Sequence, residues 1–214
     1  FGLMSDETAQ FIASIDSVGI RFISTRHENN AVSMAEGYSC SSGKLGVALI
    51  GRGPATANGL HGTVYVRKTG SKVLLMLGAG VNTVADPNGY GPDTKGLDAE
   101  SVLRAAGVRV MALQDAHTAP QLLAHAAALA AQGLQALLLP SNVLSGSTST
   151  DAITDPISLP KPKAWPEARP SAIEAAVAAL KQSRYPLILA GYGAHKSEAK
   201  QAIIELADHV GAAL

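Results

Sequence analysis

The residues best placed for chemistry are Arg26-His27-Glu28, which stand between an apolar run and a helical run. Residues 20–24 are rich in β-branched and aromatic side chains, and the small residues of positions 31–38 follow with a helical pattern. This order predicts that Glu28 lies at the carboxyl end of a strand, the edge at which open α/β sheets bind their ligands. We therefore expect one carboxylate to face a ligand crevice, and the residue types alone leave that ligand open.

A second strand-to-helix turn, Gly51-Arg52-Gly53-Pro54, directly follows the apolar run of residues 45–50. Glycine allows a tight backbone turn, and proline suits a first helical position, where its missing N–H would have no helical partner. Gly53, Pro54 and the nearby Asn58 could shape a ligand site at this turn. Taken alone the turn is weak evidence, because glycine and proline turns follow many parallel strands, so ordinary turn and capping roles are the simpler interpretation at this point.

The elements that must position these turns follow a repeated pattern of strand and helix. Helical patterns cover residues 6–17, 119–132 and 171–182. Short apolar runs, most of them continuous, predict strands at residues 20–24, 45–50, 72–77, 108–113, 136–140 and 186–190. Continuous apolar strands are typical of sheets covered on both faces, and repeated βα units imply right-handed crossovers. We predict a doubly wound α/β fold, a parallel sheet with helices on both faces.

A change in composition divides the chain into two parts. Residues 145–170 are rich in Ser, Thr, Pro and Lys and lack helical or strand periodicity, as expected for an extended linker. We predict a first domain over residues 1–144 and the incomplete start of a second α/β domain over residues 171–214. Because Phe1-Gly2-Leu3 reads as the last step of a strand, we also expect an earlier strand outside this sequence.

Composition and charge narrow the class of protein. The chain has 214 residues, 47% of them hydrophobic and 16% charged, which is enough for a sizeable core. Its 17 basic and 17 acidic residues give a formal net charge of zero, so we expect no nucleic-acid partner and no membrane partner. The single cysteine, Cys40, cannot form an internal disulfide, which agrees with a cytoplasmic location.

Several motifs carry a family resemblance. The first block contains His27-Glu28, Met34-Ala35-Glu36-Gly37-Tyr38, Gly53-Pro54 and Asn58. Later blocks are Leu74-Leu75-Met76-Leu77-Gly78, Leu137-Leu138-Leu139-Pro140-Ser141-Asn142-Val143 and Pro186-Leu187-Ile188-Leu189-Ala190-Gly191. In this order they resemble the pyrimidine-binding domain of thiamine-diphosphate-dependent enzymes, most closely the acetolactate synthase group, followed by the start of that group's central domain. The likeness covers nearly the whole chain, and its first block is the specific one.

The resemblance implies a task for Glu28. In this family a glutamate hydrogen-bonded to N1' of the cofactor's aminopyrimidine favours the imino tautomer, whose nitrogen takes the proton from thiazolium C2. Glu28 matches that glutamate, and we expect it to be substantially buried once its partner chain is present. Gly53, Pro54 and Asn58 become further candidates for cofactor binding. His27 could orient Glu28 or approach the substrate, and a purely structural role for His27 is the simpler alternative.

The resemblance also implies a reaction, the decarboxylation of a 2-oxo acid followed by carboligation, with pyruvate as the leading candidate substrate. Such an enzyme is both a lyase and a transferase. The family holds the diphosphate and its Mg²⁺ with a Gly-Asp-Gly motif, which this sequence does not contain. We therefore expect no metal ligand here, little cofactor affinity in the isolated chain and no activity without the diphosphate-binding domain. The complete site would lie between subunits of a dimer or tetramer.

Two other interpretations stay open. The chain could be the pyrimidine-half subunit of a two-chain 2-oxo acid decarboxylase, although the partial central domain argues against this. It could also be a non-catalytic binding or assembly module that kept the fold, against which the retained Glu28 counts. Some relatives carry FAD in the central domain, but a bare Gly-x-Gly such as Gly191-Tyr192-Gly193 is weak evidence, so we interpret it as structural.

The remaining residues with notable side chains receive structural interpretations. Met34 and Tyr38 fall on one helical face, so we expect them in the core. Residues 86–94, rich in Gly, Pro and Asp, are expected to form a long surface loop, with a mobile active-site loop as the alternative. Three residues of the helix after the second turn are expected to face solvent, with a partner subunit as the alternative: His61, Tyr65 and Arg67.

Overall fold

The computed structural model describes residues 1–83, 93–148 and 167–214, and the chain divides into two compact units, Phe1–Lys163 and Ala164–Leu214. Each unit is described by itself. The predicted limits of the first domain, the linker and the second domain stay predictions, because most of residues 145–170 lies outside the described residues.

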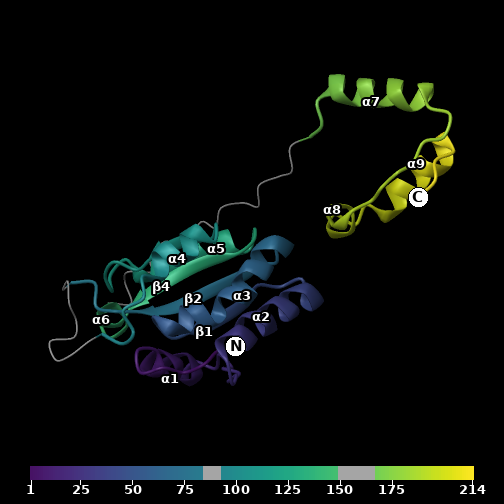
Figure 1. The fold of residues 1–214 in the computed structure, drawn as a ribbon. Coiled ribbons are helices and arrows are strands. Elements are labelled where there is room, and N and C mark those ends of the chain that lie inside the picture. The colour runs from purple at the N-terminus through teal and green to yellow at the C-terminus, as the bar shows by residue number, and fades with distance from the viewer. Residues whose placement is uncertain (84–92, 149–166) are drawn as a thin grey trace. The chain divides into compact units, whose positions relative to one another are not determined.

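A parallel sheet of four strands forms the centre of the first unit (Figure 1). The strands lie in the order β1-β2-β4-β3. Their bounds are β1 (Gly46–Ile50), β2 (Val73–Ala79), β3 (Arg109–Ala112) and β4 (Gln135–Pro140). All three neighbouring pairs are parallel, with Ile50 opposite Leu77 and Leu77 opposite Leu138. The sheet confirms the predicted α/β fold, and the four central strand predictions are correct to within about two residues.

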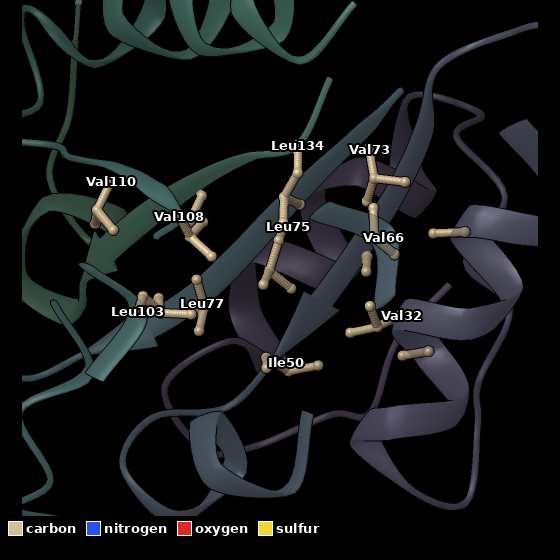
Figure 2. Close-up of a cluster of buried hydrophobic side chains, with 14 of the residues drawn as sticks. Val32, Ile50, Val66, Val73, Leu75, Leu77, Leu103, Val108, Val110 and Leu134 are labelled. Carbon is tan, nitrogen blue, oxygen red and sulfur yellow. The ribbon is translucent and has the colours of Figure 1, made fainter. Parts of the chain in front are cut away.

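Helices cover both faces of this sheet, as predicted for a doubly wound fold. One face carries α2 (Glu28–Ser42), α3 (Pro54–Thr69) and α4 (Ala99–Ala105), and the other carries α1 (Ala9–Ser17), α5 (Ala119–Ala130) and α6 (Ser141–Leu144). Successive strand residues point to opposite faces, so Leu75 and Leu77 join the first cluster whereas Leu74 and Met76 join the second. Figure 2 shows the first cluster, whose burial fixes the positions of α2 and α3 on the sheet.

The predicted strand at residues 20–24 is wrong in extent. Only Ser24 pairs, through an isolated parallel bridge to Gly2, and Gly2 also bridges Leu49 of β1. The partner segment follows the sheet only briefly, because after Leu3 the chain turns, and Ser5 accepts a hydrogen bond from the backbone N–H of Thr8 at 3.0 Å. One bridge still places the turn that precedes Glu28 beside the sheet edge.

The second unit contains α7 (Pro170–Gln182), α8 (Tyr192–Lys196) and α9 (Lys200–Val210). The predicted strand at residues 186–190 is reduced to one parallel bridge between Leu187 and Ala213. Leu189 is 93% exposed, so the apolar run has no sheet to join among the described residues of this unit. Strand composition without a pairing partner does not make a strand.

Candidate functional site

Glu28 is the first residue of α2, and a fixed turn places it there. His27 is the N-cap of that helix, and its Nδ1 accepts a hydrogen bond from the backbone N–H of Asn29 at 3.1 Å. Thr25 is buried, and its hydroxyl lies 3.1 Å from the carbonyl oxygens of both Gly2 and His27. An N-cap acceptor satisfies one of the free N–H groups of the first helical turn. The structure therefore gives His27 a capping role and leaves any role toward a ligand as a prediction.

The carboxylate of Glu28 has one defined side-chain partner. Nδ2 of Asn58, in the second turn of α3, donates a hydrogen bond to Oε2 of Glu28 at 3.0 Å. Glu28 is half-buried in this chain, whereas Asn58 is exposed. The structure thus brings together two of the residues singled out by the sequence, and it orients the carboxylate through one oxygen.

Close packing of α2 against α3 makes this pair possible. A Cβ on Gly59 would lie 3.1 Å from Ile50 Cδ1 and 3.8 Å from Cβ of Glu28. Gly62 is tighter, because its added Cβ would lie 2.8 Å from Oδ1 of Asn29, and that oxygen accepts the Gly62 N–H at 2.7 Å. Asn29 therefore links the two helices, a role that sequence reasoning missed. The sequence signal for this close helix packing was the pair Gly59 and Gly62, two glycines about one turn apart on α3.

The strand-to-helix turn at residues 51–54, which we call the Gly53 turn, leads into α3. Gly53 is the N-cap with φ +62° and ψ −116°, and Pro54 follows in the first helical turn. A Cβ on Gly53 would lie 2.2 Å from the carbonyl oxygen of Lys95, so this position needs glycine for its dihedral angles and for close backbone approach. The local roles of Gly53 and Pro54 are those of turn and capping residues, and their roles toward a cofactor stay predictions.

Four charged residues surround this turn, and we refer to Glu7, Arg52, Asp93 and Lys95 as the charged cluster. Oε1 of Glu7 accepts hydrogen bonds from Nε of Arg52 at 3.1 Å and from Nζ of Lys95 at 2.8 Å. Arg52 also reaches Oδ1 of Asp93 at 2.9 Å, and that oxygen accepts the Lys95 backbone N–H at 3.0 Å. Sequence reasoning missed this cluster, because its members come from three separate segments of the chain.

Electrostatics in the charged cluster are strongly coupled. Burial alone would raise the pKa of Glu7, but hydrogen bonds from Lys95, from the Glu7 backbone and from Ser5, together with the charge of Lys95, outweigh burial and lower the pKa to about 2. The same hydrogen bond raises the pKa of Lys95 above its ordinary value. Both groups are therefore charged throughout the neutral pH range, which favours a permanent ion pair.

A cavity of about 350 Å³ adjoins the Gly53 turn at the carboxyl ends of β1 and β2. Its lining includes Gly53, Lys95 and Gly78. Glu28 and Asn58 do not line it, so the cavity and the Glu28–Asn58 pair are separate features of the described residues. The loop prediction for residues 86–94 falls almost entirely on residues 84–92, which lie outside the described residues.

The expectation that Met34 and Tyr38 lie in the core is wrong, because each is 41% exposed. The buried arc of α2 consists of the narrow set Ala31, Val32, Ala35 and Ser39. Met34 and Tyr38 lie at the margin of that arc, and the Tyr38 ring is tilted by 57° against that of Phe1, with centroids 6.0 Å apart.

Three residues of α3 are exposed in this chain, which fits both the solvent-facing prediction and the partner-subunit alternative: His61, Tyr65 and Arg67. Arg67 also donates a hydrogen bond from Nε to the Gly107 carbonyl at 2.8 Å. Within the described residues, no group of three or more His, Cys, Asp or Glu side chains lies close enough to hold a metal ion. In the same part of the chain, no helix has the length and apolarity needed to cross a membrane.

Comparison with known proteins identifies relatives of this chain. Residues 1–93 match the family described as thiamine pyrophosphate enzyme, N-terminal TPP binding domain. Oxalyl-CoA decarboxylase of Escherichia coli (strain K12) is 25% identical over 210 residues, 96% of this chain and 37% of the relative. Acetolactate synthase of Bacillus subtilis (strain 168) is 25% identical over 209 residues, 96% of this chain and 35% of the relative.

The acetolactate synthase large subunit of Lactococcus lactis subsp. lactis (strain IL1403) is 29% identical over 185 residues, 84% of this chain and 31% of the relative. The chain thus spans about a third of the length of these curated relatives.

Proposed function

We propose, from the premise that this chain belongs to the thiamine-diphosphate-dependent enzyme family, that Glu28 engages the aminopyrimidine ring of thiamine diphosphate. The chain would supply the pyrimidine-activating half of a site that decarboxylates a 2-oxo acid and joins the remaining fragment to an acceptor. The single observation that carries this proposal is the Glu28–Asn58 pair at the start of α2 and in the second turn of α3. Its position matches the residue block on which the family resemblance rests.

The residues at this point fit an aminopyrimidine. Oε2 of Glu28 is occupied by the Asn58 amide, whereas Oε1 has no hydrogen-bond donor within the described residues. A carboxylate oxygen with a free lone pair can accept an N–H or share a proton with a ring nitrogen. Gly59 lets α3 pack closely beside Glu28, which holds the carboxylate in place at the start of α2. We therefore infer that Oε1 is the atom of Glu28 that faces the cofactor.

When bound, thiamine diphosphate supplies a carbon nucleophile that can add to the carbonyl group of a 2-oxo acid and so permit loss of carbon dioxide. Glu28 would hold a proton at the pyrimidine N1' position, and Asn58 would keep the carboxylate pointed at that nitrogen. Geometry of this kind lets a general acid or base contribute about 100-fold or more. The Gly53 turn and Pro54 would set the start of α3 and thus the position of Asn58.

We propose a second copy of the same protein as the partner, in a dimer or tetramer. The surface that supports this proposal lies on α2 and α3, where Met34 and Tyr38 are each 41% exposed and Tyr65 is 58% exposed. Exposed large apolar residues on helices that pack against each other are candidates for a protein contact. A diphosphate-binding domain on that partner would hold Mg²⁺ and further bury Glu28, consistent with the half-burial of that side chain in this chain.

We propose pyruvate as the 2-oxo acid and a cytoplasmic location. Support for pyruvate comes from the two relatives named acetolactate synthase, each near a quarter identical. The relative named oxalyl-CoA decarboxylase favours decarboxylation in the wider group.

The test is to incubate the full-length protein with thiamine diphosphate, Mg²⁺ and a panel of 2-oxo acids, following carbon dioxide release and the products by mass spectrometry. We expect release with pyruvate and a carboligated product, both lost in Glu28→Gln. The matched control is Glu174→Gln, which removes an exposed carboxylate on α7 and should behave as wild type. Weak cofactor binding without release from any acid would contradict the proposal and favour a non-catalytic module.

A further inference from the structure

The charged cluster is attached to the Gly53 turn from two sides. Arg52 immediately precedes Gly53 in the chain, and its guanidinium bridges Glu7 and Asp93. The Lys95 carbonyl lies against the Cα of Gly53, at the place where a Cβ would be only 2.2 Å away. Arg52 joins the charged cluster to the chain directly before Gly53, and the Lys95 carbonyl packs against Gly53 itself. The charged cluster therefore limits how far the turn can move.

Glu7 is the common member of these attachments. Its Oε1 accepts from both Arg52 and Lys95, and its side chain is only 13% exposed, against 15% for Arg52. Hydrogen bonds between charged groups shielded from water are stronger than neutral ones. Removing the Glu7 charge would leave Arg52 paired with Asp93 alone and Lys95 with the exposed Asp6 alone, and would weaken both attachments together.

The Gly53 turn in turn sets the position of Asn58. Helix α3 starts at Pro54, so Asn58 lies four residues on, roughly 6 Å along the helix axis. A helix transmits a displacement of its first turn with little loss, and catalytic hydrogen bonds lose much of their effect when groups move by about 1 Å. The Asn58 Nδ2 to Glu28 Oε2 distance of 3.0 Å is therefore sensitive to the charged cluster.

We propose that Glu7 is a positioning residue for Glu28, acting through Arg52, Lys95 and the Gly53 turn to hold Asn58 in place. This inference rests on the proposed function for its effect on catalysis, whereas its effect on the turn stands on the contacts alone. Glu7 touches neither Glu28 nor Asn58, and it lies on the segment that follows the Gly2 bridge rather than on α2 or α3.

The experiment compares Glu7→Gln with Asp6→Asn in the full-length protein. Asp6 makes a matched control, because its fully exposed carboxylate lies 3.7 Å from the same Lys95 and contacts nothing in the turn. Hydrogen–deuterium exchange of the backbone amides of residues 53–58, apart from Pro54, which has no N–H, is measured without cofactor. Exchange of the cofactor C2 proton is then measured at saturating thiamine diphosphate and Mg²⁺.

We expect Glu7→Gln to speed amide exchange at residues 53–58 and to slow C2 proton exchange, each by about tenfold, as for loss of a charge-assisted hydrogen bond. Asp6→Asn should match wild type in both. Arg52→Lys keeps the charge but removes the planar guanidinium whose separate nitrogens reach Glu7 and Asp93, so it should reproduce Glu7→Gln, and the double variant should be no worse than the more affected single variant. If Glu7→Gln fails to fold, Lys95→Met is measured in its place with the same expectation.

The inference would be overturned if Glu7→Gln exchanged its amides at residues 53–58 and the cofactor C2 proton at wild-type rates. Amide exchange in Glu7→Gln no faster than in the control Asp6→Asn would overturn it as well. A purely structural role would lower thermal stability while leaving C2 exchange unchanged at a temperature where the variant is folded, and this result also overturns it. Failure of the proposed function has a different signature, since Glu28→Gln would then keep wild-type C2 exchange. Amide exchange at residues 53–58 would still decide the role of Glu7.

Discussion

Replacing Gly53 by alanine should destabilise the first unit strongly, because the added methyl group would be strained by the backbone dihedral angles and would also clash with a neighbouring carbonyl. Gly53 has φ +62° and ψ −116°, a combination that costs an L-residue about 1–3 kcal/mol. The added Cβ would also lie 2.2 Å from the Lys95 carbonyl oxygen, where ordinary contact begins at 3.4 Å. The Lys95 backbone would have to retreat by roughly 1 Å in a packed region that resists such movement.

That retreat has its own consequences for the charged cluster. The Lys95 backbone N–H donates to Asp93 at 3.0 Å, and its Nζ donates to Glu7 at 2.8 Å, so moving the backbone strains both hydrogen bonds. Adding an overpacking cost of about 1–3 kcal/mol to the backbone cost gives a total loss of about 2–6 kcal/mol in the free energy of unfolding. A loss of this size is a large fraction of the stability of an ordinary domain.

The assay is urea unfolding followed by far-ultraviolet circular dichroism, with Gly37→Ala as the matched control. Gly37 lies inside α2, and a Cβ there meets nothing within 4 Å, so alanine should stabilise that helix by about 0.5–1 kcal/mol. The two alanine substitutions should therefore change the unfolding midpoint in opposite directions. A Gly53→Ala protein within about 1 kcal/mol of wild type would refute the account of this turn.

Three further predictions concern the groups around the site. Because the pKa of Glu7 falls from 4.5 to about 2 on folding, the stability that ionised Glu7 adds is complete above pH 4.5 and is lost as pH falls toward 2. The 37% exposure of Lys95 limits this contribution to the free energy of unfolding to about 1–3 kcal/mol. Glu7→Gln should lack that part of the acid-induced loss of stability. Asn29→Ala should cost about 0.5–1.5 kcal/mol in urea unfolding by removing the hydrogen bond from the Gly62 N–H that joins α2 to α3, and an unchanged midpoint would contradict the inter-helix link. Asn58→Asp should weaken thiamine diphosphate binding about tenfold in titration calorimetry, because it sets a second carboxylate against Glu28, and unchanged affinity would count against the pair.

The central sheet could be predicted from sequence because of how parallel strands are buried. Both faces of β2 and β4 are covered, so their residues form continuous apolar runs that mark them clearly. The runs at residues 20–24 and 186–190 have similar composition but form only single bridges. Composition reports the tendency to pair, whereas the length of an available partner decides whether a strand forms.

The candidate site was predictable only in part. The position of Glu28 followed from chain order, since a strand-like run and a helix start bracket it. Its contact with Asn58 depends on the packing of α2 against α3, and the linking residue Asn29 is recognisable only once the glycines of α3 are seen to face it. The same holds for Glu7 and Lys95, which are far apart in the sequence and meet through a charge pair that residue spacing does not reveal.

The most direct test of the central claim is the rate at which the C2 proton of thiamine diphosphate exchanges with deuterium in the full-length Glu28→Gln protein, followed by NMR after acid quenching. We predict a rate at least about 100-fold below wild type, the contribution of one positioned acid–base group, with circular dichroism and unfolding midpoint unchanged. The control variant Glu174→Gln should exchange at the wild-type rate. Exchange in Glu28→Gln within about threefold of wild type would contradict the assignment of Glu28.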